Sequence, residues 1–293
     1  MSTETLVRFL DSPPGPPRGG APAGDGGDHA LLDAYSNAVI SVVERVGPSV
    51  VALNLSDDCP TGRAEHFKEF LRLLIAADLK LGLVINNMRA DRVDAELVEL
   101  SRRAGAASLC LGAEHGNPEV FALVNKGETL DDIRRAAGLI KAGGLELGLC
   151  FVIGLPGDTY ERHQDSVRLA RELAPPLIYW NMAHPFPGTE MHRWFVEHGA
   201  SLDPPRTYTS YDNHSLRSVE PVVATPEFSK WERRRAYFLA VVETDQYVMN
   251  WRAPADLIAG ALRYRLPLPA LRSFSRRLVR GGWRRLRARL RRH

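Results

Sequence analysis

The amino-acid sequence predicts an α/β protein in which parallel strands alternate with helices. Strand-like and helix-like segments alternate five times between residues 50 and 200, a pattern typical of a parallel sheet with helical crossovers. The strand-like segments are also continuously apolar, as expected for strands that are buried on both faces. Ligands bind at the carboxyl ends of the strands in such folds, so we expect any site at that edge of the sheet.

Residues 148–153 form the clearest strand-like run, and a Gly-Leu-Pro-Gly turn follows at residues 154–157. Glycine permits the sharp backbone turn, and Asp158 or Thr159 can cap the polar helix that comes next. Backbone amides at such a turn suit an anionic or polar ligand. The turn is therefore a candidate for the rim of a site.

The remaining elements follow from apolar periodicity and from glycine stops after the helical segments. We expect further strands at 48–55, 81–85, 107–111 and 177–182, and helices at 63–78, 95–104, 118–124, 130–142 and 159–173. Alternation ends after residue 200. Residues 201–265 are expected to form a cover loop and helices, including an amphipathic helix at 226–249.

The N-terminal part has a different composition. Residues 1–28 are rich in Pro and Gly and are expected to be a disordered leader. Residues 29–55 predict a helix and a strand, and the text LLDAYSNAVISVVERVGPSVVALNL resembles the opening of trypsin-like serine proteases of the high-temperature-requirement type. Protease activity is not expected, because the partners of a catalytic triad do not follow.

Polar side chains collect where the predicted strands end. They are Asp57, Asp58, Asn87, Arg89, Glu114, His115, Asp158, Asn181 and His184. Loop Asp and Asn residues often cap helices, and an Arg89–Asp91 pair on the surface would contribute little. Glu114 directly follows an apolar strand and is the better candidate for ligand contact. His184 is either a site residue or a hydrogen-bonded filler.

Composition sets the broad class. The chain has 293 residues, 44% of them hydrophobic, and only three cysteines, Cys59, Cys110 and Cys150. This is ordinary for a globular protein and does not suggest a disulfide framework, so we expect a reducing, cytoplasmic setting. No apolar run approaches the roughly 20 residues of a transmembrane helix, and no signal peptide is evident.

The charge is divided unevenly along the chain. Residues 271–293 contain ten Arg and no acidic residue, so a net charge of +3 leaves −7 for the remainder. Residues 266–293 form a basic tail in which Leu, Phe and Trp are spaced among the arginines. Such a tail predicts contact with an anionic membrane surface or nucleic acid, or else a solvated terminus.

Four phrases in chain order carry a family resemblance. They include SDDCPTGRAEHF, LCLGAEHGNPEVFALVNKGETL, GLCFVIGLPGDTYERH and NMAHPFPGTEMHRWF, each at a predicted strand end. Residues 51–199 resemble the radical S-adenosylmethionine (radical SAM) enzymes, particularly the cobalamin-binding branch. The resemblance implies an α/β fold of the incomplete (β/α)6, TIM-like partial-barrel type over residues 56–200, with parallel strands, followed by a helical C-terminal region.

The resemblance also implies cofactors and site residues. Members of this family bind S-adenosylmethionine and a [4Fe-4S] cluster and cleave S-adenosylmethionine reductively to begin radical chemistry. By resemblance, Glu114, Gly154, Pro156 and Asn181 border the nucleotide. The small-molecule substrate and the catalytic residues stay unassigned.

The sequence departs from the family in its cysteines. The family holds its cluster with a Cys-x-x-x-Cys-x-x-Cys loop, because three thiolates bind three irons and leave one iron open. Cys59, Cys110 and Cys150 are far apart in the sequence, so no metal ligand is predicted. We interpret the chain as a radical SAM protein that is truncated and catalytically impaired, the alternative being a non-catalytic binding module that uses the half-barrel mouth and the basic tail.

Overall fold

The computed structural model describes residues 53–55, 59–78, 82–204, 220–244, 246 and 253–265. The predictions for the leader, for most of residues 29–55, for Asp57 and Asp58, and for the basic tail lie outside these residues. Among the residues described, no helix combines the length and the apolar character that crossing a membrane requires. The division into domains stays a prediction.

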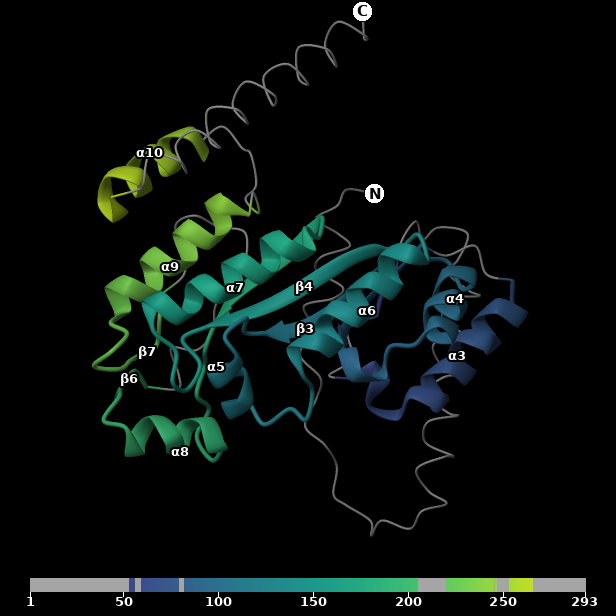
Figure 1. Cartoon of the computed structure of the whole chain (residues 1–293), viewed down its shortest axis with the longest axis horizontal. Coiled ribbons are helices and arrows are strands. Elements are labelled where there is room, and N and C mark those ends of the chain that lie inside the picture. Colours follow the sequence, from purple (N-terminus) through teal and green to yellow (C-terminus); the bar gives the residue numbers. More distant parts are fainter. Residues whose placement is uncertain are drawn as a thin grey trace, which may run out of the picture. The chain divides into compact units, whose positions relative to one another are not determined.

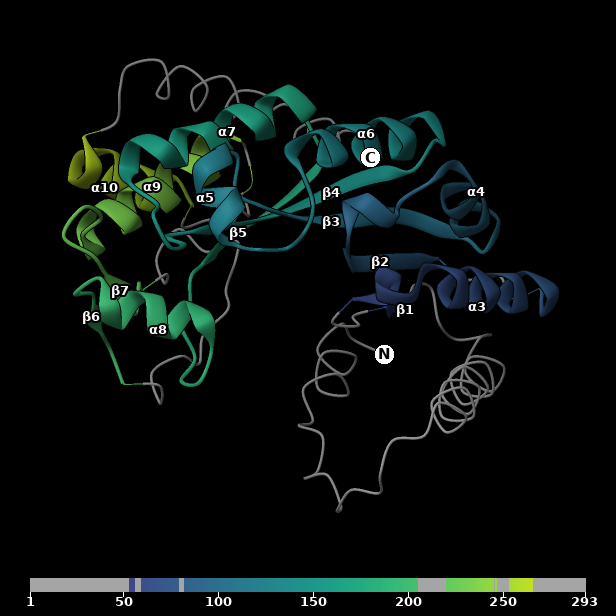
Figure 2. The same cartoon turned by 60° about the horizontal axis from the view of Figure 1, so that its bottom comes forward.

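A five-stranded parallel sheet forms the centre of the fold, with strands in the order β1-β2-β3-β4-β5. The strands are β1 (Leu53–Leu55), β2 (Leu83–Met88), β3 (Ala106–Glu114), β4 (Glu146–Ile153) and β5 (Leu177–Met182). They curl into a half-barrel, which confirms the predicted partial-barrel fold (Figure 2). Neighbouring strands are consecutive in sequence because each crossover adds its strand to the same side.

Helices cover one face of this sheet. They are α3 (Ala64–Ala76), α4 (Ala95–Arg103), α6 (Leu130–Ala142), α7 (Tyr160–Leu173) and α9 (Lys230–Glu243). Figure 1 shows α6 and α7 lying across β3 and β4. Threonine side chains begin two of these helices: Thr129 forms a capping box with Asp132 at α6, and Thr159 caps α7.

The crossovers contain shorter elements, and further elements follow the sheet. Three lie in the crossovers: η2 (Pro60–Arg63), η3 (Ala90–Arg92) and α5 (Pro118–Leu123). After the sheet come α8 (Glu190–Glu197), the antiparallel pair β6 (Ser201–Leu202) and β7 (Val223–Ala224), and finally α10 (Ala253–Tyr264). The predicted cover loop between β6 and β7 falls on residues 205–219, outside the described part of the chain.

The core lies between the sheet and the helices. Trp180 on β5 stacks on Phe151 of β4 with ring centroids 4.7 Å apart, and both side chains are fully buried. The indole N–H of Trp180 donates to Thr244 Oγ1, directly after α9. Helix α9 is shorter than the predicted 226–249 and is buried on most sides rather than on one, because it packs against both β4–β5 and α7.

Candidate functional site

The two faces of the sheet have different chemistry. The face under the helices carries large apolar side chains, such as Leu109, Phe151 and Trp180. We call the opposite face the inner face. Strand register places many small or polar residues there, beside the apolar Val84, Val152 and Leu177: Asn54, Asn86, Ser108, Cys110, Gly112, Gly148, Cys150, Tyr179 and Asn181. An inner face of this composition offers several polar groups that a ligand could contact.

Glu114 ends β3 in a conformation that turns its side chain back onto the inner face. The β3–β4 register shifts between Gly112 and Glu114, and Glu114 has a φ of 55°. A Cβ added to Gly112 would lie 2.7 Å from both Glu114 Oε1 and Lys126 Nζ. Glycine at position 112 therefore gives the Glu114–Lys126 pair its place against the strand.

Lys126 fixes this carboxylate. Its Nζ donates to Glu114 Oε1 at 3.0 Å and to the Gly112 carbonyl at 2.8 Å. Both side chains are mostly buried, with 19% and 23% exposed, which strengthens a charged hydrogen bond relative to one in water. Lys126 was not selected from the sequence, although the Asn-Lys-Gly phrase that contains it was part of the family resemblance.

Further charges continue from this pair toward β2. The Glu128 side chain is fully buried, with Oε2 3.7 Å from Lys126 Nζ and Oε1 3.4 Å from Arg89 Nε. Burial raises the pKa of Glu128 above its ordinary value. Burial alone would raise the pKa of Asp91, but the hydrogen bond from Arg89 Nε at 3.0 Å and the charges of Arg89 and Arg92 together lower this pKa below its ordinary value.

Alternating charges thus follow the carboxyl edge of β2 and β3. We call Glu114, Lys126, Glu128, Arg89 and Asp91 the charged row. The side chains of Arg89 and Asp91 are three-quarters or more buried, so the expectation of a surface pair is wrong. The backbone N–H of Arg89 donates to Thr61 Oγ1 of η2, which holds the residue in place.

Hydrogen bonds to other residues of the protein fix the Gly-Leu-Pro-Gly turn after β4. Gly154 has a φ of 81°; its N–H donates to Asp158 Oδ2 at 2.7 Å, and its carbonyl accepts from Arg233 Nη1 at 2.8 Å. Gly154 and Pro156 are buried. Asp158 therefore closes the turn, while Thr159 alone caps α7.

Arg233 comes from α9 and is itself almost fully buried. It lies over the Phe228 ring at 4.8 Å, and its Nε donates to the Phe228 carbonyl. Burial lowers the pKa of Arg233 to about 10, although the Asp158 carboxylate opposes this change and raises the pKa. The buried charge of Asp158 is thus compensated by Arg233 and by the Gly154 N–H.

His115, Asp158 and His163 form a compact buried group beside this turn. Their ligand-type atoms lie within 4.8 Å of one another, a size that could suit a metal ion. However, His115 Nδ1 accepts the Asn117 backbone N–H, so the ring proton is on Nε2, 3.1 Å from Asp158 Oδ1. A protonated Nε2 has no lone pair for a metal. The group is better explained as internal support of the turn.

Asn181 and His184 lie at the end of β5. Asn181 is half-buried, belongs to the inner face, and donates through Nδ2 to the Phe151 carbonyl at 3.3 Å. The ring of His184 shares a hydrogen bond with the Met182 carbonyl, and burial lowers the pKa of His184. Of the four residues predicted to border a nucleotide, Glu114 and Asn181 thus belong to the inner face, whereas Gly154 and Pro156 lie in the buried turn.

The cysteines do not form a site that fits a [4Fe-4S] cluster. Cys59 precedes η2, whereas Cys110 and Cys150 are within the sheet. The neighbouring Cys150 thiol and burial together raise the pKa of Cys110, which opposes the thiolate form that iron requires.

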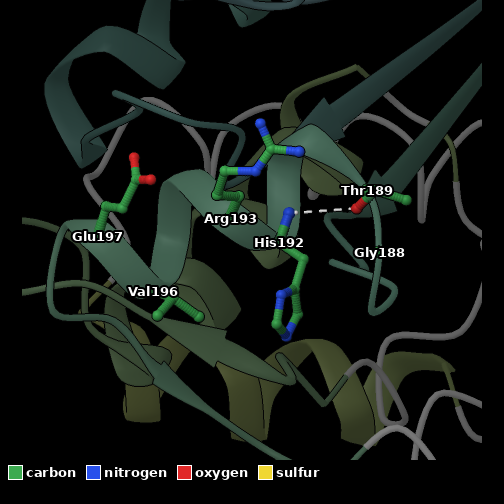
Figure 3. Close-up of a pocket in the computed structure, with 6 residues that line it drawn as sticks. All are labelled: Gly188, Thr189, His192, Arg193, Val196 and Glu197. Carbon is green, nitrogen blue, oxygen red and sulfur yellow. Dashed lines mark hydrogen bonds between the residues drawn. The ribbon is translucent and has the colours of Figure 1, made fainter.

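A shallow depression of about 320 Å³ lies beside α8. Figure 3 shows its lining, which comes from that helix and the turn before it: Gly188, Thr189, His192, Arg193, Val196 and Glu197. None of the residues predicted for the site is among them. The charged row therefore remains the candidate site.

Comparison with known proteins identifies the class. Residues 36–170 match the model of the Radical SAM superfamily, so the chain carries a radical SAM domain. The match includes most of residues 29–55, and the resemblance of that segment to serine proteases is therefore not borne out. Membership of the superfamily implies S-adenosylmethionine and an iron–sulfur cluster as its cofactors.

Two relatives are similar to this chain over part of its length. The chain is 32% identical over 179 residues to the anaerobic magnesium-protoporphyrin IX monomethyl ester cyclase of Rubrivivax gelatinosus, covering 61% of this chain and 31% of that protein. It is 24% identical over 125 residues to an uncharacterised methyltransferase of Pyrococcus horikoshii, covering 42% and 27%. The chain thus spans about a third or less of these relatives.

Solved structures share the fold. The radical S-adenosylmethionine methyltransferase TsrM of Kitasatospora setae, with cobalamin and a [4Fe-4S] cluster bound, matches with a TM-score of 0.54 and 17% identity over 74% of this chain and 46% of its own. Coproporphyrinogen III oxidase (HemN) of Escherichia coli matches with a TM-score of 0.51 and 16% identity, covering 73% and 46%.

Proposed function

We propose that this radical SAM domain binds S-adenosylmethionine on the inner face of its half-barrel and that its own cysteines do not support reductive cleavage. The observation that carries the proposal is the Glu114–Lys126 pair held over Gly112. The methionine part of S-adenosylmethionine carries one ammonium and one carboxylate. Lys126 offers a cation to the carboxylate, and Glu114 offers an anion to the ammonium.

The rest of the charged row supports the pair. Glu128, buried beside Lys126 with Oε2 3.7 Å from its Nζ, limits where the lysine ammonium can move. Asn181, half-exposed on β5, adds an amide to the same face. S-adenosylmethionine supplies an activated sulfonium centre when bound, and the residues of this chain bind and orient it.

The cofactors set the limits of the proposal. Because the cysteines present do not fit a cluster, we propose a catalytically impaired protein, with a non-catalytic binding module as the alternative. A reducing, cytoplasmic compartment belongs to the same proposal, since all three cysteines have free thiols in the structure. The small-molecule substrate stays open.

Calorimetric titration of cluster-free protein with S-adenosylmethionine tests the binding step. Lys126→Met should weaken binding about 10- to 100-fold, the cost of one charge-assisted hydrogen bond in a partly buried site. Lys230→Met is the matched control, because Lys230 pairs with Asp203 at 2.6 Å through α9, outside the charged row. Equal affinity in the two variants, or no binding by the unaltered protein, would contradict the proposal.

The same preparation can test the loss of catalysis. After anaerobic treatment with iron and sulfide we expect no stoichiometric [4Fe-4S] absorbance and no cleavage of S-adenosylmethionine. A full cluster accompanied by cleavage would overturn the impaired assignment while leaving the binding site intact.

A further inference from the structure

Helix α10 packs on α9 through one side. Gly260 of α10 lies against the Phe238 ring of α9 so closely that an added Cβ would clash with the ring. One turn further, Tyr264 is buried, and its ring centroid is 5.3 Å from that of Phe238. Figures 1 and 2 both show α10 beside α9. Gly260 and Tyr264 therefore mark the buried side of α10.

The opposite side of α10 exposes two large apolar side chains. Ile258 is 55% exposed, and Leu262 is 78% exposed, the largest fraction among the big apolar side chains that the structure describes. A helix turns about 100° per residue, so Ile258 and Leu262 share one face, which points away from the side marked by Gly260 and Tyr264. We call Ile258 and Leu262 the apolar strip. Removing the strip from water by contact with an apolar partner would be favourable.

Positive charge lies next to the apolar strip. Arg263 belongs to the last turn of α10, Arg265 directly follows the helix, and both are exposed. Neither side chain forms an ion pair within the part of the chain that the structure describes. Residues 257–293 contain no Asp or Glu. The charge of this region is therefore complementary to an anionic partner, which long arginine side chains can reach from beside an apolar contact.

A lipid surface fits the apolar strip better than a protein does. A stable protein interface covers about 800 Å² on each partner, far more than two aliphatic side chains provide. A helix that lies on a bilayer needs only an apolar face that enters the headgroup region and cations beside that face. Helix α10 has 12 residues, whereas crossing a bilayer takes about 20. It is therefore suited to lie on the surface of a bilayer.

We propose that the apolar strip of α10 is a docking surface for an anionic lipid bilayer. The strip enters the headgroup region, and Arg263 and Arg265 contact the lipid phosphates. Two aliphatic side chains hold a protein at a membrane only weakly, so α10 acts together with the arginines of residues 266–293. The docking surface does not depend on binding of S-adenosylmethionine.

Sedimentation of the full-length protein with vesicles tests the docking surface. One set of vesicles contains equal parts of phosphatidylglycerol and phosphatidylcholine, and the other contains phosphatidylcholine alone. We expect binding to the anionic set only. Ile258→Gln and Leu262→Gln should each weaken this binding roughly 3- to 10-fold, the effect of withdrawing one aliphatic side chain from apolar surroundings. The release of bound protein by salt should stay as steep, because the charges are unchanged.

Leu73→Gln is the matched control, because Leu73 is an aliphatic residue of α3 that is 44% exposed. It should bind vesicles as the unaltered protein does, and circular dichroism checks that all three variants fold. Unchanged binding by Ile258→Gln and Leu262→Gln, an equal loss in Leu73→Gln, or no preference for anionic vesicles would overturn the proposal. Light scattering without lipid tests a second copy as the occupant: a dimer that the α10 variants lose would also overturn it.

Discussion

At residue 154 both the backbone conformation and the packing require glycine. The φ of 81° is unfavourable for any residue with a side chain, and an added Cβ would lie well inside contact distance of the buried Arg233 guanidinium. We expect Gly154→Ala to lower the free energy of unfolding by about 2 kcal/mol or more, because strain and a buried clash add together. Urea denaturation measures the change.

Gly138 provides a control within the same fold. It lies on the exposed side of α6, and nothing approaches the position of its missing Cβ within 4 Å. Gly138→Ala should therefore stabilise the protein by about 0.5–1 kcal/mol, through helix propensity alone. A loss of stability at 154 no larger than the change at 138 would contradict the packing argument.

The sequence predicts the need for glycine at 154 but not its partner. A Gly-Leu-Pro-Gly phrase after an apolar run specifies a tight turn by local chemistry. Arg233, which is 79 residues later, reaches the turn only through the tertiary fold. Likewise, Glu114 was recognisable from its place at a strand end, whereas Lys126 is brought to it by the β3 bulge, for which the sequence has no local signal.

Between α7, β5 and α9 lies a buried layer that contains an ionisable ring. His163 on α7 is fully buried and packs edge-on against Trp180 of β5, with ring centroids 5.5 Å apart. Burial lowers the pKa of His163 to about 4, since removal from water disfavours the charged ring. Asp158 raises this pKa and His115 lowers it further, but neither offsets burial.

Stability should depend on pH through this residue. Above about pH 6.5 the His163 ring is neutral in both the folded and the unfolded protein. Between pH 6.5 and 4 the unfolded chain binds a proton that the folded protein does not, so the free energy of unfolding falls as the pH is lowered. The loss is on the order of 3 kcal/mol and ends near pH 4.

His163→Phe keeps an aromatic ring against Trp180 and should remove this part of the pH dependence. Denaturant unfolding at several pH values from 7 to about 4 measures the difference between the two proteins. His66→Gln, at a partly exposed position on α3, should retain the steep loss. Parallel curves for the unaltered protein and His163→Phe would show that this ring does not titrate on unfolding.

Element types were more predictable than element surroundings. Strand and helix positions follow from local periodicity, and the five strands and their covering helices lie where that pattern places them. Helix α9 was expected to be amphipathic, yet Tyr237, Leu239 and Val242 are all buried. A second side of α9 is buried because α7 packs against it. The apolar periodicity of a single helix cannot predict such a contact with another helix.

At the scale of the whole chain, charge separates two regions. Residues 271–293 carry ten Arg, and the remainder has a net charge of −7. This distribution is visible only in the sequence, because the tail lies outside the described residues. The domain match at residues 36–170 ends well before the tail, so the superfamily supplies no role for it.

The tail's charge predicts binding to an anionic lipid surface. Each Arg near such a surface contributes about 1 kcal/mol, and the interspersed Leu, Phe and Trp add apolar contact. In vesicle sedimentation the full chain should pellet with anionic vesicles and not with neutral ones, and raised salt should release it. A chain ending at Pro267 should stay in the supernatant. Equal sedimentation of the two chains would exclude this role, and preferential binding of the full chain to nucleic acid would assign the same charges to a different polyanion.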